Sequence, residues 1–143
     1  MNSVAIVFWS DTGNTEKMAT LIADGATKNG AEVSLFRAKE FRPSQIDSFD
    51  IIAFGCPAMG AEELEEEEFQ PMFSSCEGKL SGKKIALFGS FGWGDGEWMR
   101  NWEDVCKKDG AVLVSASVIC NNEPDAEAEI SCKALGEALA LQK

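Results

Sequence analysis

Six consecutive residues near the N-terminus have the side chains and the glycine that an anion site requires. They are Ser10, Asp11, Thr12, Gly13, Asn14 and Thr15, and they follow an apolar run and precede a helical pattern. The free N–H groups and the positive dipole end of a helix N-terminus attract an anion. Gly13 lets the backbone turn close to a ligand without a Cβ in the way. The segment has no Lys or Arg, so hydrogen-bond donors alone would neutralise the anion. This pattern predicts a site for a buried terminal phosphate rather than for a mobile polyphosphate with its metal.

The same residue types also cap helices, because their side-chain oxygens accept hydrogen bonds from the first free N–H groups. One cap needs one such residue, whereas residues 10–15 hold five of them. We therefore favour phosphate binding over capping alone.

Two later segments combine glycines with apolar or aromatic residues that a packed core does not explain. Residues 56–62 are Cys-Pro-Ala-Met-Gly-Ala-Glu, and residues 89–96 are Gly-Ser-Phe-Gly-Trp-Gly-Asp-Gly. Aromatic rings on a glycine-rich loop favour a flat ligand to stack against, since stacking contributes about 0.5–1.5 kcal/mol beyond area burial.

The elements that must position these segments alternate along the chain. Runs rich in Val, Ile, Phe or Leu predict five strands, at Val4–Trp9, Glu32–Phe36, Ile51–Gly55, Lys84–Ser90 and Val112–Ile119. The first, third and fourth runs are almost continuously apolar, which is typical of a parallel sheet covered on both faces. Apolar residues at helical spacing predict four helices, with the faces Met18, Leu21, Ile22 and Gly25; Phe69, Met72, Phe73 and Cys76; Trp98, Trp102, Val105 and Cys106; and Ile130, Ala134, Leu135 and Ala138. Pro43–Ser48 is predicted to form a short helix or turn.

This alternation predicts one doubly wound α/β domain that spans residues 1–143. In open α/β sheets, ligands bind outside the carboxyl ends of the strands. Segments 10–15, 56–62 and 89–96 each follow a predicted strand, so we expect them to meet at that edge of the sheet.

The bulk composition narrows the possible partners. The chain has 24 acidic and 13 basic residues and a net charge of −11. This charge argues against binding of DNA or RNA and favours basic or multivalent partners, although acidic residues can also serve only to keep a protein soluble. The five cysteines are scattered and there is no histidine, so we predict no disulfide framework and no metal site, but buried thiols in a reducing cytoplasm. No stretch is long enough to span a membrane.

The three loops resemble, in order, the FMN-contacting loops of the short-chain bacterial flavodoxins. The resemblance rests on the patterns S-x-T-G-N-T, C-P-A-M-G-x-E and G-S-F-G-W-G-D-G, and it extends to Asn122–Asp125. It implies a flavodoxin-like fold, in which a five-stranded parallel sheet of order 2-1-3-4-5 has helices on both faces. It also implies a low-potential electron-transfer protein with non-covalently bound FMN that uses the semiquinone/hydroquinone couple, with neither catalytic residues nor a metal.

By this resemblance, the first loop would hold the FMN phosphate, with the carboxylate of Asp11 pointing outward. Met59 and Trp93 would sandwich the isoalloxazine ring, and Glu62 would accept a hydrogen bond from the ring N3–H. Backbone from Ser90 to Gly94 would line the pyrimidine edge. The cofactor-binding residues that it implies are Ser10, Asp11, Thr12, Gly13, Asn14, Thr15, Ala58, Met59, Gly60, Ala61, Glu62, Ser90, Phe91, Gly92, Trp93, Gly94 and Asn122.

Gly60 would carry the redox switch, because in the family the carbonyl of this glycine turns toward the flavin N5 and stabilises the neutral semiquinone. Glycine suits such a turn, since it reaches positive φ at little steric cost. Ala61 stands where relatives often carry a polar residue.

The acidic run Glu62–Glu68 has two interpretations. It could supply ordinary carboxylates at a helix start. Because it also follows a flavin loop, its charge could lower the reduction potential and steer basic redox partners into transient complexes. Trp9, Trp98 and Trp102 are predicted to be core or core-edge residues.

Two other functions compete with that of an electron carrier. An FMN-dependent reductase of a quinone-like acceptor would need room for a substrate over the ring, which Trp93 is expected to cover. A phosphoacceptor signalling domain would need an acidic pair after the first strand and an aspartate at the end of the third, but the first strand leads to a lone Asp11 and the third ends in Gly55-Cys56. We expect a cytoplasmic monomer rather than an enzyme with its own substrate.

Overall fold

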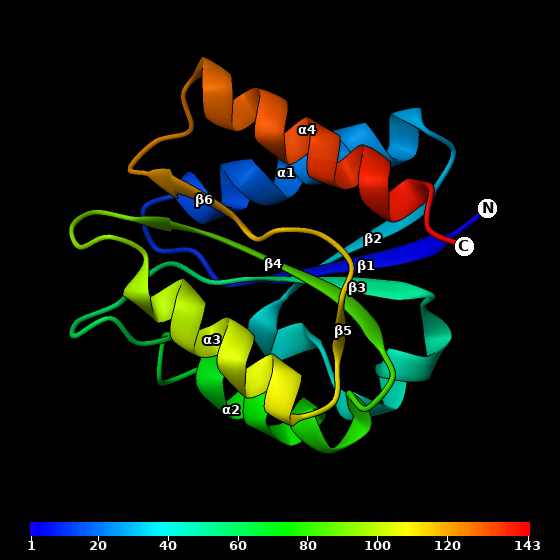
Figure 1. Cartoon of the computed structure of the whole chain (residues 1–143), viewed down its shortest axis with the longest axis horizontal. Helices are drawn as coiled ribbons and strands as arrows, with labels where there is room; N and C mark the ends of the chain where they lie inside the picture. The colour runs from blue at the N-terminus through cyan, green and yellow to red at the C-terminus, as the bar shows by residue number, and fades with distance from the viewer.

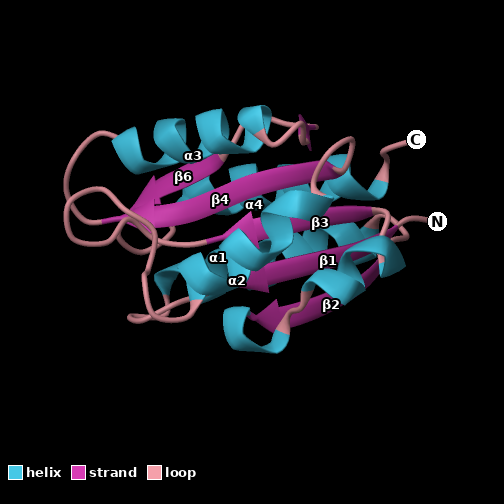
Figure 2. Cartoon of the chain, turned by 90° about the horizontal axis from the view of Figure 1, so that it is seen from below, coloured by secondary structure: helices cyan, strands magenta, loops and turns pink.

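The computed structural model describes all of residues 1–143 and has a central parallel sheet between two layers of helices (Figure 1). The strand order is β2-β1-β3-β4-β5, and the further strand β6 also pairs with β4 (Figure 2). All neighbouring strands are parallel. The doubly wound fold with strand order 2-1-3-4-5 is therefore confirmed. The strands are β1 (Ser3–Phe8), β2 (Glu32–Arg37), β3 (Ile51–Gly55), β4 (Lys84–Phe91), β5 (Val112–Leu113) and β6 (Val118–Asn121).

The fifth position of the sheet differs from the prediction of one continuous strand over Val112–Ile119. It holds two short strands, with Leu113 of β5 opposite Ile85 and Val118 of β6 opposite Phe88. From Leu113 to Val118 the edge of the sheet therefore contains two more residues than the matching stretch of β4 from Ile85 to Phe88. The residues between β5 and β6 are thus not paired one to one with residues of β4. An edge strand tolerates such an interruption because only one of its sides is hydrogen-bonded to a neighbour.

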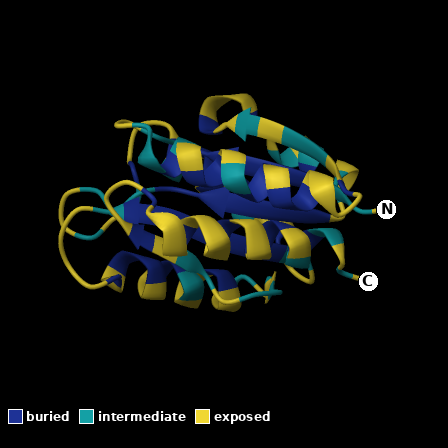
Figure 3. Cartoon of the chain, turned by 90° about the horizontal axis from the view of Figure 1, so that it is seen from above, coloured by how far each residue is buried: buried dark blue, intermediate teal, exposed yellow.

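Four helices cover the sheet in pairs. Helices α1 (Asn14–Lys28) and α4 (Ala126–Ala140) lie on one face, and α2 (Phe69–Cys76) and α3 (Glu97–Lys108) lie on the other (Figure 1). An apolar cluster fills each side, and the central strands are buried between the two clusters (Figure 3). Three short 3-10 helices complete the chain, at Ala38–Glu40, Pro43–Ser48 and Glu77–Lys79, and the second of them confirms the prediction for Pro43–Ser48.

The buried face of α4 matches the predicted one only at Leu135. Ile130 is 70% exposed and Ala134 is also exposed, whereas Cys132, Leu135 and Gly136 are buried. A Cβ on Gly136 would lie only 2.1 Å from the backbone oxygen of Ile22 in α1. The absence of that side chain lets the two helices approach closely, and this contact decides which face of α4 turns inward.

Helix α3 shows one smaller departure from its predicted face. Trp98, Trp102 and Cys106 are buried as expected, but Val105 is 39% exposed. The eight-residue helix α2 is shorter than α3, and Val105 lines a groove that remains between the two helices. Trp9, which was also predicted to be a core or core-edge residue, is partly buried against the core. Its indole N–H donates to Glu68 Oε1 at 2.9 Å.

All five thiols are buried and unpaired, which confirms that they act as small apolar residues. Burial raises the pKa of the Cys106 and Cys132 thiols to about 12 and that of Cys120 to about 11. None of the helices combines the length and apolar character that crossing a bilayer demands.

Part of the acidic run caps a helix. The carboxylate of Glu65 is buried and accepts backbone N–H groups from Glu67, Glu68 and Phe69 at 2.7–2.8 Å, at the start of α2. Burial by itself would raise the pKa of the Glu65 carboxyl, but these three donors outweigh it and hold the pKa below its usual value. The helix-start interpretation therefore describes Glu65 well.

Replacing Glu65 with Gln is expected to lower the free energy of unfolding by about 1–3 kcal/mol at pH 7, because the charged acceptor of three N–H groups is lost. Since its folded pKa is depressed, Glu65 contributes this stability above the unfolded pKa of about 4.3 and loses it as pH falls through the folded pKa. Urea unfolding at pH 7 and pH 3 should therefore show a smaller difference between variant and parent at pH 3. Glu67→Gln, whose carboxylate caps nothing, is the control, and an equal loss in both variants would contradict the assignment.

Candidate functional site

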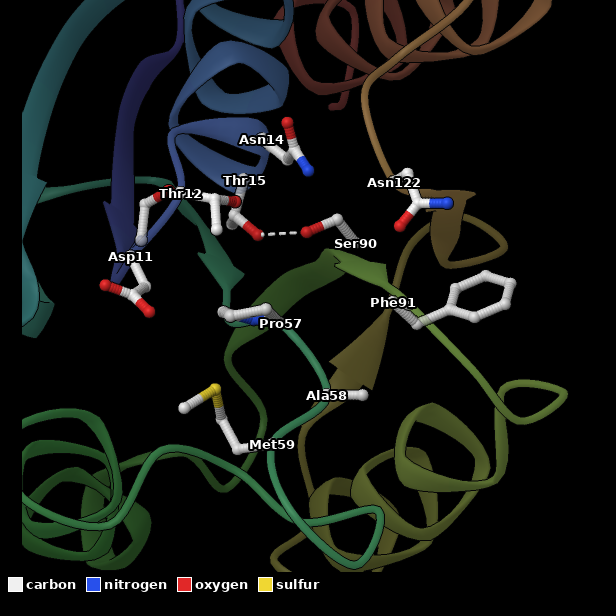
Figure 4. Close-up of a pocket in the computed structure, with 12 residues that line it drawn as sticks. Asp11, Thr12, Asn14, Thr15, Pro57, Ala58, Met59, Ser90, Phe91 and Asn122 are labelled. Atoms are coloured by element: carbon white, nitrogen blue, oxygen red, sulfur yellow. Dashed lines mark hydrogen bonds between the residues drawn. The ribbon is translucent and has the colours of Figure 1, made fainter.

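The carboxyl ends of β1, β3 and β4 enclose a cavity of about 170 Å³ (Figure 4). The first loop lies on one side of it, the loop after β3 on another, and the end of β4 closes it. The three segments singled out in the sequence therefore meet at this edge of the sheet, as expected. The lining residues are Ser10, Asp11, Thr12, Asn14, Thr15, Pro57, Ala58, Met59, Ser90, Phe91, Gly92 and Asn122.

The first loop combines a helix cap with free donors. Ser10 Oγ accepts the N–H groups of Gly13 and Glu16 at 3.2 Å each, so Ser10 caps the start of α1. Gly13 stands at φ +98°, a conformation that favours glycine. The backbone N–H groups of Thr12, Asn14 and Thr15 have no acceptor within the protein. One residue therefore suffices for capping, and the other donors remain available to a ligand.

A buried hydroxyl pair joins the first loop to β4. Thr15 Oγ1 and Ser90 Oγ lie 2.9 Å apart, and the two residues are 1% and 5% exposed. The resemblance implies only backbone contacts for Ser90. Because the side chain of Ser90 instead lines the cavity beside Thr15 (Figure 4), the phosphate end has one more hydroxyl than the sequence indicates.

The loop after β3 is a short closed turn. Met59 and Glu63 exchange two backbone hydrogen bonds of 2.8 and 3.0 Å, and only residues 60–62 lie between them. Gly60 stands at φ +49° and Glu62 at φ +60°. A Cβ on Gly60 would meet no heavy atom within 4 Å, so the peptide next to Gly60 has open space around it while both ends of the turn are held.

The carboxylate of Glu62 connects the second and third loops. Its Oε2 accepts the backbone N–H of Trp98 at 2.8 Å, which caps α3. Its Oε1 lies so close to Gly94 that a Cβ there would be 1.9 Å away. Glu62 is therefore oriented by the helix on one side, with its other oxygen beside Gly94 of the third loop.

Six of the predicted residues do not line the cavity itself, namely Gly13, Gly60, Ala61, Glu62, Trp93 and Gly94. They belong to the loops around it, and Trp93 is 65% exposed.

Two lining residues differ from the expectation. Pro57 was not predicted, although it stands between Cys56 and Ala58 in the loop that the sequence singled out. The ring of Phe91 points away from the cavity (Figure 4) and packs 5.5 Å from Trp98. Phe91 therefore contributes mainly its backbone, whose carbonyl accepts the N–H of Asn122 at 2.8 Å.

The residues present fit FMN. At the phosphate end, unpaired N–H groups and hydroxyls surround a space whose lining includes no Lys or Arg, and the carboxylate of Asp11 points away from Thr15 (Figure 4). Such donors at a helix N-terminus stabilise a phosphate. Met59 lines the same cavity, and Trp93, in the loop after β4, is exposed.

Comparison with known proteins identifies the family. The family model for flavodoxin matches residues 6–135. The chain is 48% identical over 135 residues to the flavodoxin of Clostridium beijerinckii, which covers 94% of this chain and 97% of that protein. It is 45% identical over 137 residues to the flavodoxin of Megasphaera elsdenii, which covers 96% and 98%.

The structural comparison agrees. The solution structure of two-electron reduced Megasphaera elsdenii flavodoxin superposes with a TM-score of 0.90 at 45% identity, covering 97% of this chain and 99% of that one. Fold, loop arrangement and sequence therefore all lead to one family. The chain belongs to the flavodoxins, FMN-binding proteins that carry electrons to redox partners and have no substrate of their own.

Proposed function

We propose that residues 1–143 form one domain that carries single electrons at low potential, working on the lower of the two one-electron couples of its FMN. When bound, FMN supplies an isoalloxazine ring that takes up and releases electrons. The chain binds the cofactor, orients its ring and provides the charged surface around it. The observation that carries this proposal is the cavity at the ends of β1, β3 and β4, where the free N–H groups of the first loop face a space without cationic side chains.

At the phosphate end, the hydroxyls of Ser10, Thr12 and Thr15, the amide of Asn14 and the free backbone N–H groups would donate to the phosphate. Ser10 accepts two N–H groups through its oxygen, so its own proton remains to be donated. Because several neutral donors share the charge, the phosphate is held at one place without a mobile counter-ion.

At the ring end, Met59 and Trp93 would cover the two faces, with Trp93 on the more exposed side. Glu62 Oε2 is already bonded to Trp98, which leaves Oε1 to accept from the ring N3–H. Ala58, Ala61, Gly92, Gly94 and Asn122 complete the surroundings of the ring. In this arrangement, the same carboxylate orients both α3 and the cofactor.

The test compares FMN with riboflavin, which has the same ring but no phosphate. A hydrogen bond to a charged group contributes about 1.5–3 kcal/mol, so two or more of them predict that riboflavin binds at least about 100-fold more weakly than FMN. Quenching of flavin fluorescence during titration of the flavin-free protein measures both affinities. Equal affinities would refute the phosphate site, and no binding of FMN at all would refute the function.

Gly60→Ala is expected to narrow the separation between the two one-electron midpoint potentials by about 90–170 mV, because a penalty on the one-electron-reduced state moves the two potentials by about 40–90 mV each in opposite directions. A residue with a Cβ loses about 1–2 kcal/mol in left-handed conformations, and Gly60 stands at φ +49° in the turn whose peptide is proposed to reorient. Spectroelectrochemical titration measures the separation. Gly82→Ala is the matched control, because Gly82 also has positive φ and open space but precedes β4, away from the site. An unchanged separation in Gly60→Ala would show that this peptide does not control the potentials.

We further propose that the partners are redox proteins with basic surfaces, met in transient complexes by a cytoplasmic monomer. Within the acidic run, Glu62, Glu65 and Glu68 hold structural hydrogen bonds. Glu63, Glu66 and Glu67 have no cationic partner in the chain. Their uncompensated charge beside the ring supports both steering of basic proteins and a lowered potential.

A further inference from the structure

A second hollow is lined by residues of α2 and α3, the two helices that cover one face of the sheet (Figure 1). It has a volume of about 430 Å³, within the range of about 300–1,000 Å³ that is usual for binding sites. Glu62 lines it and also belongs to the turn at the rim of the FMN site. The groove therefore reaches the turn that follows β3.

The groove is lined by carboxylates without any cation. Glu63, Glu66 and Glu77 line it, and no Lys or Arg does. The three ion pairs of the chain, which involve Lys17, Arg37 and Arg100, use none of these carboxylates. Burial, together with the nearby Asp109, raises the pKa of the Glu77 carboxyl. A positive charge placed there would relieve this repulsion.

The groove also presents apolar surface. Val105 is 39% exposed beside Leu64, Phe73 and Trp102. The indole N–H of Trp102 is buried without an acceptor. An occupant that complements this groove combines positive charge with an apolar side chain.

We propose that the groove between α2 and α3 docks a basic amphipathic segment of the protein with which the chain exchanges electrons. Such a segment places Lys or Arg against Glu66 and Glu77 and an apolar side chain against Val105. A second copy of the chain, with a net charge of −11, or a nucleic acid would be repelled. The proposal rests on the proposed function, and it adds a docking surface beyond the edge of the flavin.

The first test measures electron transfer from the reduced, FMN-loaded protein to cytochrome c, a basic haem protein, by stopped-flow spectroscopy. The double variant Glu66→Gln/Glu77→Gln is expected to lower the bimolecular rate constant about three- to tenfold at low ionic strength, with the difference vanishing at high salt. The control Glu127→Gln/Glu129→Gln removes the same charge from α4, on the opposite face of the sheet, and should change the rate constant less than about 1.5-fold. Equal slowing in both pairs would mean that net charge alone acts, and it would overturn the groove.

The second test uses a synthetic helical peptide of Lys and Leu, added to the ¹⁵N-labelled, FMN-loaded protein. The indole N–H signals of Trp98 and Trp102 are expected to shift, and Val105→Ser should weaken peptide binding about fivefold. Ile130→Ser on α4, where Ile130 is 70% exposed, should leave binding unchanged. Shifts confined to other elements would overturn the proposal. Because FMN content is measured separately, failure of the groove leaves the function intact, whereas a protein without FMN refutes the function itself.

Discussion

Gly136→Ala is expected to destabilise the protein by about 3 kcal/mol, with a corresponding fall in the midpoint of urea unfolding. The added Cβ would lie 2.1 Å from the oxygen of Ile22 and 2.7 Å from the nitrogen of Ala26. Both are backbone atoms of a helix and cannot turn aside as a side chain would. The two helices must move apart, and overpacking of this kind costs about 1–3 kcal/mol or more.

The matched control for this variant is Gly78→Ala. A Cβ added at Gly78 would meet no heavy atom within 4 Å, and Gly78 does not have positive φ. An Ala at such a position should be neutral or stabilise the fold by up to about 1 kcal/mol, because the unfolded chain loses freedom. Urea unfolding of the flavin-free forms compares the two variants directly. Equal stability of Gly136→Ala and Gly78→Ala would show that α1 and α4 do not depend on this close contact.

Thr15→Val is expected to raise the dissociation constant of FMN about 10- to 150-fold. The substitution keeps the shape of the side chain but removes a hydroxyl that is proposed to donate to the phosphate, an interaction of about 1.5–3 kcal/mol. It also leaves the buried Ser90 Oγ without its partner at 2.9 Å. Fluorescence titration of the flavin-free variant with FMN measures the change.

The loss in Thr15→Val should be specific for the phosphate. The affinity for riboflavin is expected to stay within about twofold of the parent, so the preference for FMN over riboflavin shrinks. Thr20→Val serves as the control, because the hydroxyl of Thr20 lies on the exposed side of the same helix and bonds only to the Glu16 oxygen. If both flavins lost affinity equally, the variant would be acting through the fold rather than through the phosphate.

Most of the fold could be predicted from local patterns. The runs of β1, β3 and β4 are apolar because both faces of these strands are covered, and such runs are visible without any knowledge of their neighbours. The predictions that were wrong concern contacts between distant segments. Nothing near Ile130 in the sequence indicates that the opposite side of α4 meets α1, because that depends on where Ile22 lies.

In the candidate site, too, local residue types could be read from the sequence, whereas contacts between distant segments could not. The types of residues in the first loop are enough to predict an anion held there by neutral donors, because the chemistry of Ser, Thr and Asn is local to each residue. The assignment of the acidic run did not follow from composition. Glu62 and Glu65 cap two different helices, and six similar carboxylates can be told apart only by the backbone groups that surround them.

The proposed anion-binding role of the loop at residues 10–15 thus follows from the sequence by itself, as do the succession of strands and helices along the chain and the glycine-rich loops that follow the strands. Only the tertiary structure decided that Thr15 meets Ser90, that Glu62 joins two loops, and that an acidic groove remains between α2 and α3. The physical reason is the distance along the sequence over which each property is set. Hydrogen-bonding types and apolar periodicity are properties of neighbouring residues, whereas these contacts join residues that are up to 75 positions apart and form only once the sheet brings the strand ends together.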